Sequence, residues 1–205
     1  MAAQVASPWK TRAGRAAERS RKRDAVLRIA ARSFCEKGVR ATSLDAIAER
    51  LNVTKPTLYH YFAGKDEILA ACVLTGLAMI DAALAEAGGA HALDRLGSAL
   101  RRYAAVMTLD FGRCASRVAE TELSPAAREA FRARRRAVDA RIRGLIREGM
   151  REGSIRPGDV ALTASTVAGA LNGIAHWYDP AGPLPADEVA RRVVEVLLGG
   201  LAPTG

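Results

Sequence analysis

Helical periodicity runs through almost the whole chain and restricts its fold more than any other feature. Apolar residues recur at spacings of three and four, as in Leu27, Ala30, Ala31 and Phe34, which places them on one face of a helix. No segment shows a convincing alternation of apolar and polar residues, the pattern of a half-buried strand. With 205 residues, 49% of them hydrophobic, the chain is long enough to bury a core. The sequence therefore predicts an all-α fold.

Positive charge is concentrated in the first third of the chain. Residues 1–65 carry 14 Lys or Arg and 5 Asp or Glu, whereas residues 66–205 carry 17 of each sign. Binding to DNA phosphates requires such a concentration on one module, so this third is predicted to contact nucleic acid. Residues 1–23 have no apolar stripe and are expected to form a flexible basic arm. The arm either reaches DNA phosphates or a minor groove, or is only a solubilising tail.

After a supporting helix expected over residues 24–37, two short helices are separated by a tight turn. Thr42 and Asp45 fit a capping box at the start of the first of them. Asn52 tolerates the left-handed conformation that such a turn requires, and Val53 is expected to enter the core. Thr54 is expected to cap the next helix. A three-residue turn between short helices is the helix-turn-helix spacing, and it predicts a DNA-binding domain.

The second helix of this pair, expected over residues 55–61, is predicted to face DNA. Leu58 and Phe62 should point inward, and Pro56 is harmless in the first turn. The remaining hydroxyl, phenol, imidazole and ammonium groups suit phosphates, base edges and thymine methyls better than they suit an ordinary solvated face. Lys65 begins the following helix, where free backbone N–H groups also favour a phosphate. The domain is predicted to span residues 24–70.

Residues 42–69 resemble the DNA-binding domain of TetR/AcrR-type repressors. The resemblance rests on Thr-Ser-Leu-Asp-Ala-Ile-Ala from Thr42, Val-Thr-Lys-Pro-Thr-Leu-Tyr-His-Tyr-Phe from Val53, and then Lys65 and Leu69. It implies a homodimer whose two recognition helices enter successive major grooves of a palindromic double-stranded DNA operator. The DNA-contacting positions that it implies are Thr42, Lys55, Thr57, Tyr59, His60, Tyr61 and Lys65.

Residues 71–205 are predicted to form a helical ligand-binding and dimerisation domain. Its two most apolar helices are the last two, and close helix approach is expected at Gly169, Ala170 and Gly173. Two such helices from each subunit would make a four-helix interface about a two-fold axis. The expected helices cover residues 66–87, 91–110, 111–121, 125–152, 159–178 and 186–198.

The helix over residues 125–152 is rich in arginine. Ten arginines lie between Arg128 and Arg156, against four acidic residues. Their charge alone would suit a second nucleic-acid surface. Because residues 66–205 are neutral as a whole, we favour a solvated helix face balanced by acids elsewhere.

Three segments of the C-terminal half resemble repressors of lipid and sterol catabolism that release DNA on binding a CoA thioester. These segments are residues 121–125, 147–149 and 172–184. The resemblance implies a small-molecule inducer such as an acyl-CoA, with cationic side chains near the mouth of its cavity. Arg113 and Arg117 are the candidates to meet the phosphates, and ordinary surface arginines are the alternative.

Enzyme and membrane functions are not indicated. G-x-S-x-G, Walker A and G-x-G-x-x-G motifs are absent from the sequence, and the histidines lack metal-ligand spacing. We therefore expect no catalytic residue, metal or cofactor.

Cys35, Cys72 and Cys114 are expected to be reduced, buried thiols of a cytoplasmic protein. Polar residues interrupt the uncharged run over residues 160–178, which favours a buried helix over a membrane span. The main alternative is a sequence-tolerant architectural DNA-binding protein, and an enzyme is a remote one.

Overall fold

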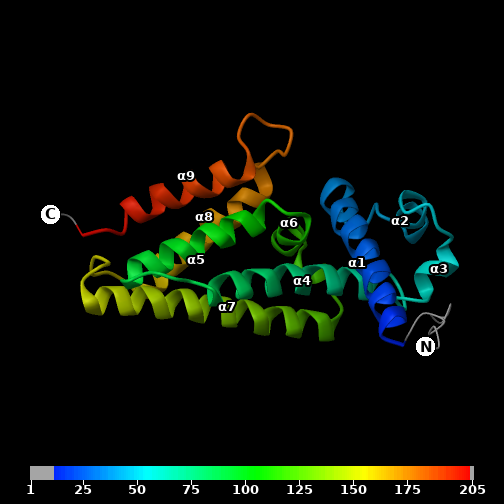
Figure 1. Cartoon of the computed structure of the whole chain (residues 1–205), viewed down its shortest axis with the longest axis horizontal. Coiled ribbons are helices and arrows are strands. Elements are labelled where there is room, and N and C mark those ends of the chain that lie inside the picture. Colours follow the sequence, from blue (N-terminus) through cyan, green and yellow to red (C-terminus); the bar gives the residue numbers. More distant parts are fainter. Residues whose placement is uncertain (1–11, 204–205) are drawn as a thin grey trace, which may run out of the picture.

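The computed structural model describes residues 12–203, which are helical along most of their length (Figure 1). No strand occurs within these residues, so the predicted all-α fold is confirmed. α1 to α3 gather at one end of an elongated molecule, and α4 leads away from them into a bundle with α5 to α9. The elements are α1 (Arg12–Lys37), α2 (Leu44–Arg50), α3 (Lys55–Tyr59), α4 (Lys65–Ala85), α5 (Ala92–Met107), α6 (Asp110–Arg117), the 3-10 helix η1 (Glu120–Glu122), α7 (Pro125–Glu152), α8 (Val160–Trp177) and α9 (Ala186–Gly199).

The turn between α2 and α3 forms as the sequence predicts. Asn52 has a φ of 53°, the left-handed conformation that asparagine tolerates. Thr54 occupies the N-cap position of α3, but its side chain makes no capping hydrogen bond to the helix backbone. Pro56 lies in the first helical turn, where a missing N–H costs nothing. The expectation for Val53 is wrong, because its side chain is exposed at the surface of the turn. Core packing at the turn therefore depends on other residues.

α1 begins earlier than predicted. The sequence suggested a flexible arm over residues 1–23, but residues 12–23 continue α1 for three further turns. An ion pair between Lys22 and Glu18 (2.9 Å), four residues apart, supports this part of the helix. Arg23 lies over the ring of Phe62, with its guanidinium carbon 4.6 Å from the ring centroid. The remainder of the predicted arm, residues 1–11, lies outside the described residues.

Helix ends in the larger domain follow local sequence signals closely. Ser124 caps α7 by accepting a hydrogen bond from the N–H of Ala127, and the helix stops at Gly153, whose φ is 81°. Asp159 caps α8 by accepting hydrogen bonds from the N–H groups of Ala161 (2.7 Å) and Leu162 (2.9 Å). These helices pack around one core that is continuous with that of α1 to α3.

α6 is wedged against its neighbours through two glycines. A Cβ atom on Gly76 of α4 would lie 2.2 Å from the carbonyl oxygen of Phe111. A Cβ atom on Gly112 of α6 would lie 2.0 Å from the carbonyl oxygen of Val106. Only glycine allows backbones to approach so closely. α6 therefore sits in direct backbone contact with α4 and with the end of α5.

α4 is the one helix within residues 12–203 that is long and apolar enough to cross a membrane by length and composition. Half of its most apolar stretch is buried inside the molecule. Its buried side chains, among them Ile68, Leu69, Leu77 and Ile80, belong to the common core. The core helix of a globular bundle has the same length and composition, and the packing of α4 is of that kind.

Candidate nucleic-acid interface and ligand cavity

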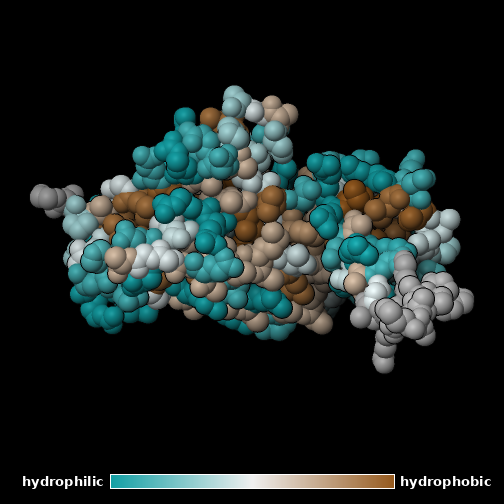
Figure 2. Space-filling model, in the orientation of Figure 1, coloured by the Kyte–Doolittle hydropathy of each residue, from teal (hydrophilic) through white to brown (hydrophobic). Residues whose placement is uncertain are grey.

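α3 presents its polar residues outward, as predicted. Leu58 is buried and Phe62, just beyond the helix, is buried with it, so both fix α3 to the core. Tyr59 is 52% exposed and His60 is exposed, whereas Thr57 is half-buried. On the face shown in Figure 2, hydrophobic residues come to the surface among α1 to α3 as well as in the larger domain. The exposed aromatic ring of Tyr59 is suited to pack against a sugar or a thymine methyl.

Lys55, at the start of α3, is held by a carboxylate of α2. Its Nζ atom lies 2.9 Å from Oδ2 of Asp45, and this hydrogen bond raises the pKa of Lys55. The hydroxyls of Thr54 and Thr57 are hydrogen-bonded to each other at 2.9 Å. These contacts orient the first turn of α3 at the surface. A phosphate that approached here would compete with Asp45 for the ammonium group.

Tyr61 lies beside α1. It packs against the core and, with His60, lines an open depression whose other wall is made by α1 residues. The guanidinium of Arg19 donates a hydrogen bond to the carbonyl oxygen of His60 (3.3 Å). Lys22 and Tyr61 border the same depression. The basic N-terminal turns of α1 thus lie next to the end of α3. The sequence did not predict this proximity.

Thr42 does not fit the predicted set of DNA contacts, because its side chain is buried. It is only 1% exposed, and its hydroxyl donates to the carbonyl oxygen of Gly38 (2.8 Å) and lies 3.2 Å from that of Ser33. The predicted capping box is also wrong, because Ser43 caps α2 and accepts the hydrogen bond from the N–H of Ala46 (3.1 Å). Thr42 is therefore a structural residue that ties the α1–α2 loop to α1.

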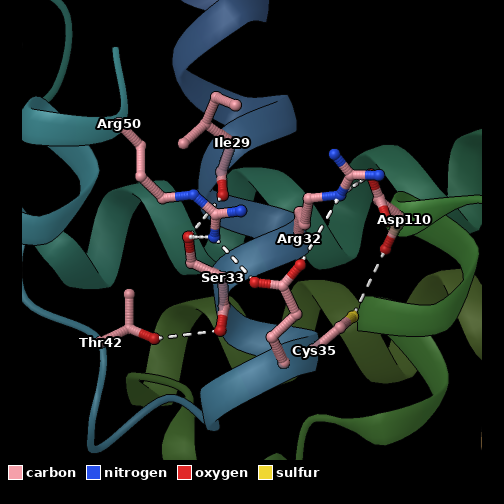
Figure 3. Close-up of polar contacts among 8 residues, drawn as sticks. Ile29, Arg32, Ser33, Cys35, Thr42, Arg50 and Asp110 are labelled. Carbon is pink, nitrogen blue, oxygen red and sulfur yellow. Dashed lines mark hydrogen bonds and ion pairs between the residues drawn. The ribbon is translucent and has the colours of Figure 1, made fainter. Parts of the chain in front are cut away.

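Arg50 completes this junction from the other end of α2 (Figure 3). Its Nη1 atom donates to Oγ of Ser33 (2.9 Å) and to the carboxylate of Glu36 (2.8 Å), both on α1. On the opposite side of α1, Arg32 lies 3.8 Å from the carboxylate of Asp110, and the thiol of Cys35 lies 3.7 Å from the carbonyl oxygen of Asp110. α1 is thus in polar contact with α2 on one side and with α6 on the other.

Lys65 is the first residue of α4 and is partly buried, with Gly64 as the N-cap residue. Glu67 accepts a hydrogen bond from the N–H of Ala63 (2.6 Å), which ties the residue before the N-cap to the first turn of α4. Lys65 follows the end of α3 by only six residues. Its contact with a phosphate remains a prediction.

A cavity of about 710 Å³ opens in the larger domain, between α4, α5, α6, α7 and α8. A volume of this order holds a drug-sized ligand. Large apolar side chains form much of its wall, including Leu77, Ile80, Met107, Phe131 and Ile142.

Four arginines of α7 also line the cavity: Arg132, Arg135, Arg136 and Arg143. The interpretation of this helix as a purely solvated arginine face is therefore incomplete. Glu120 of η1 lies 2.7 Å from Nε of Arg132 and 2.9 Å from Nη1 of Arg135. The hydrogen bond from Arg132, with the charges of both arginines, lowers the pKa of Glu120. The wall thus combines an apolar surface with concentrated positive charge.

Arg113 and Arg117, the predicted ligand contacts, are not among the residues that line this cavity. Both lie on α6, near Cys35 of α1, where their charges partly oppose a rise in the pKa of that thiol. The rise is caused first by a hydrogen bond with Cys114 and then by burial. Nε of Arg113 is buried without a hydrogen-bond partner. The short α6 helix turns this side toward α1 and away from the cavity.

A polar pair, Tyr103 and Asn172, lines the cavity. The hydroxyl of Tyr103 donates to Oδ1 of Asn172 (2.9 Å), and the hydroxyl of Ser116 donates to the carbonyl oxygen of Asn172 (3.2 Å). Burial raises the pKa of Tyr103 to about 12. The pair offers a ligand a hydroxyl and an amide within an otherwise apolar region.

The outward faces of α8 and α9 expose apolar side chains. Leu162 is 69% exposed, Trp177 is 56% exposed and Val196 is 77% exposed. On α8, between the first two, Ala170 is exposed and Gly169 is exposed as well. Large apolar side chains gathered on adjacent helices are typical of an interface.

All three cysteines are free and buried, as predicted. They come from α1, α4 and α6, and the thiol of Cys72 lies 3.4 Å from the carbonyl oxygen of Leu27. Among residues 12–203, no group of three or more His, Cys, Asp or Glu is placed to hold a metal ion.

Two family models cover most of the chain. Residues 26–72 match the model described as "Bacterial regulatory proteins, tetR family". Residues 89–201 match the model described as "Tetracyclin repressor-like, C-terminal domain". The first match includes α2 and α3, and the second includes the α7 and α8 residues that line the cavity.

Several known proteins resemble the chain along its length. It is 26% identical over 194 residues to the HTH-type transcriptional repressor KstR2 of Mycobacterium tuberculosis, covering 90% of this chain and 94% of that protein. The structure of KstR2, a ketosteroid transcriptional regulator, aligns with a TM-score of 0.81 at 25% identity over 89% of this chain and 96% of that chain. PfmR from Thermus thermophilus, a TetR family transcriptional regulator, aligns with a TM-score of 0.78 at 33% identity, over 87% of this chain and 99% of that chain.

AibR, solved in complex with isovaleryl coenzyme A and operator DNA, shares the fold. Its TM-score is 0.76 at 23% identity, over 90% of this chain and 100% of that chain.

Proposed function

The chain belongs to the TetR family of bacterial regulatory proteins, and from that premise we propose that it is a repressor released from a palindromic operator by a small-molecule inducer. As a member of this family it is a DNA-binding transcriptional regulator. The observation that carries the proposal is the recognition helix α3, fixed inward by Leu58 while Tyr59 and His60 face outward. We infer that the protein acts in the cytoplasm and is not an enzyme.

The proposed DNA contacts are Lys55, Thr57, Tyr59, His60, Tyr61 and Lys65. Tyr59 offers the largest exposed surface on α3, and Lys55 supplies a charge at its start. Tyr61, half-buried beside α1, is proposed to contact the phosphate backbone through its hydroxyl. Exposed cations on the first turns of α1, such as Arg19 and Lys22, lie next to this end of α3 and extend the positive surface.

The proposed assembly is a homodimer that buries the outer faces of α8 and α9. Leu162, Trp177 and Val196 would otherwise remain in water, and Gly169 and Ala170 allow the helices of two subunits to approach closely. Analytical ultracentrifugation should show a dimer for the wild type and a shift toward monomer for V196E. L109E, which changes an exposed apolar residue on another surface, is the matched control. A wild type that is monomeric at micromolar concentration would contradict this assembly.

The proposed inducer is an acyl-CoA or a related CoA thioester. The cavity joins a large apolar wall to a row of arginines, which matches a ligand with an apolar acyl group and several phosphates. The isovaleryl coenzyme A complex of AibR, a protein that shares the fold, supports this class of ligand.

DNA binding is tested by fluorescence anisotropy with the duplex upstream of the protein's own gene and with a random duplex, each at about 50 and about 200 mM salt. A repressor should prefer its operator by roughly a thousandfold or more. The alternative is a sequence-tolerant architectural protein, which would use the same α3 surface. Equal affinity for both duplexes at both salt concentrations would favour that alternative.

Ligand binding is tested by thermal shift with acyl-CoAs of increasing chain length, coenzyme A, free fatty acids and unrelated drugs. A ligand present at about 100 times its Kd stabilises the protein by about 2.7 kcal/mol, which is readily measured. We expect acyl-CoAs to raise the melting temperature and to release operator DNA. If all CoA compounds leave the melting temperature unchanged at millimolar concentration, the thioester proposal fails while the regulator assignment stands.

A further inference from the structure

Glu120 occupies an unusual position in the cavity wall. Its carboxylate is partly buried between Arg132 and Arg135, with one oxygen 2.7 Å from the first guanidinium and the other 2.9 Å from the second. All three side chains line the cavity. A carboxylate held by two guanidinium groups has the same hydrogen-bond pattern as a bound phosphate would have. The protein therefore carries its own anion at the most cationic part of the cavity.

The segment that carries Glu120 is short and is held mainly by α7. η1 has only three residues and joins α6 to α7. Arg128 supports it from α7, because its Nε donates to the carbonyl oxygen of Glu120 (2.9 Å) and its Nη2 donates to that of Leu123 (3.1 Å). The Glu120 side chain adds two ion pairs to this hold. Removing them would leave backbone contacts as the main attachment of the turn.

Within residues 12–203, Glu120 is the only carboxylate that pairs with Arg132 or Arg135. Arg136, their neighbour on α7, pairs instead with Glu129 (3.1 Å), and Arg143 pairs with Asp139 (2.6 Å). An anion that bound the same donors, Nε of Arg132 and Nη1 of Arg135, would therefore have to displace Glu120. The released carboxylate would meet water at the cavity mouth, where it is already partly exposed.

We propose that Glu120 is a built-in placeholder for the anionic group of the inducer, so that inducer binding requires the exchange of one anion for another on Arg132 and Arg135. The proposal rests on the function proposed for the cavity, and it adds a regulatory step to it. In the ligand-free protein, Glu120 offsets one of the two positive charges of Arg132 and Arg135 and holds η1 against α7. In the liganded protein, a phosphate binds Arg132 and Arg135 in place of Glu120. The two ion pairs then no longer hold η1 and the adjoining end of α6 against α7.

The test compares the affinities of the wild type, E120Q and E122Q for two anions, coenzyme A and inorganic pyrophosphate, by isothermal titration calorimetry. E120Q keeps the shape of the side chain but removes the competing charge. We expect its Kd for both anions to fall by about threefold to tenfold, the range expected when partly exposed ion pairs cease to compete. E122Q is the matched control, because Glu122 lies on the same turn and accepts a hydrogen bond from the N–H of Ala119 (3.3 Å). Its Kd should equal that of the wild type.

The outcomes separate this proposal from the function proposed above. An E120Q variant that binds pyrophosphate and coenzyme A no more tightly than the wild type overturns the placeholder, even if acyl-CoAs bind and release DNA. Absence of binding of either anion to any variant at millimolar concentration overturns it as well. Conversely, tighter anion binding by E120Q supports the placeholder even where acyl chains add no affinity, which would count against the acyl pocket alone. Should E120Q fail to fold, E120A, which also removes the competing charge, gives the same comparison.

Discussion

The contact between α4 and α6 gives a sharp test of the packing that links the cavity to the DNA-binding end. We predict that Gly76→Ala destabilises the protein. The added Cβ would lie 2.2 Å from the carbonyl oxygen and 2.8 Å from the carbonyl carbon of Phe111, and 2.9 Å from the Cβ atom of Ala115. The nearest two atoms belong to the backbone and cannot rotate away. α6 must therefore move as a unit, or α4 must bend.

The magnitude follows from two opposing effects. Replacing a helical glycine with alanine stabilises a helix by about 1 kcal/mol, whereas overpacking a well-packed core costs about 1 to 3 kcal/mol and sometimes more. Because the clash at Gly76 involves rigid backbone, we expect the upper part of that range and a net loss of about 1 to 2 kcal/mol. Gly144→Ala on α7 is the matched control, since nothing lies within 4 Å of its added Cβ. That variant should be stabilised by about 0.5 to 1 kcal/mol.

Thermal unfolding followed by circular dichroism measures both effects. For a chain of this length, 1 kcal/mol corresponds to a shift of about 2 to 4 °C in Tm. G76A should therefore melt below the wild type and G144A above it, at the same protein concentration. A Tm for G76A equal to or above that of the wild type would refute the reasoning, because it would mean that α4 and α6 separate without cost.

Three further predictions concern the DNA contacts and the cavity. Tyr59→Ala should weaken operator binding by about 1 to 3 kcal/mol in fluorescence anisotropy with the dimer intact, and unchanged binding would remove Tyr59 from the interface. Lys65→Ala should reduce the slope of log K against log salt by about one for each subunit of the dimer; an unaltered slope would show that Lys65 meets no phosphate. Burial raises the pKa of Tyr103 to about 12, so the folded protein keeps a proton that the unfolded chain loses above pH about 10. The free energy of unfolding in urea should therefore fall between pH about 10 and about 12 more steeply for the wild type than for Y103F, and equal slopes would contradict this assignment.

Elements whose ends are set by neighbouring residues could be predicted from the sequence. Ser124 and Gly153 fix the ends of α7 at the predicted positions, and Asn52 fixes the turn before α3, because each acts on backbone groups within a few residues. The outward face of α3 follows in the same way from the inward spacing of Leu58 and Phe62. Local chemistry is sufficient in these cases.

Features that depend on distant contacts could not be predicted in this way. Thr42 is as suitable a cap as Ser43 by residue type, and only the approach of the α1 carbonyl groups decides that it is buried. The N-terminal part of α1 is supported in part by Phe62, because the guanidinium of Arg23 lies over its ring. The resemblance to CoA-responsive repressors suggests Arg113 as a ligand contact, but the direction of α6 turns it toward α1. In each case the deciding partner lies outside the local segment.

The arginines of α7 show why the cavity itself is hard to read from the chain. Arg132, Arg135 and Arg143 share one helix face by their spacing, and Ile142 lies beside them, so the face that the sequence suggested to be solvated is a mixed one. Whether such a face meets solvent or lines a ligand cavity depends on the size of the side chains on the helices opposite it. Small residues of α6 and α8, such as Ala115 and Gly169, leave that space open. The cavity is therefore encoded by several small residues on separate helices. Residues 66–205 are neutral as a whole, but α7 has a local excess of arginine, and the carboxylate that pairs with Arg132, Glu120, comes from another element.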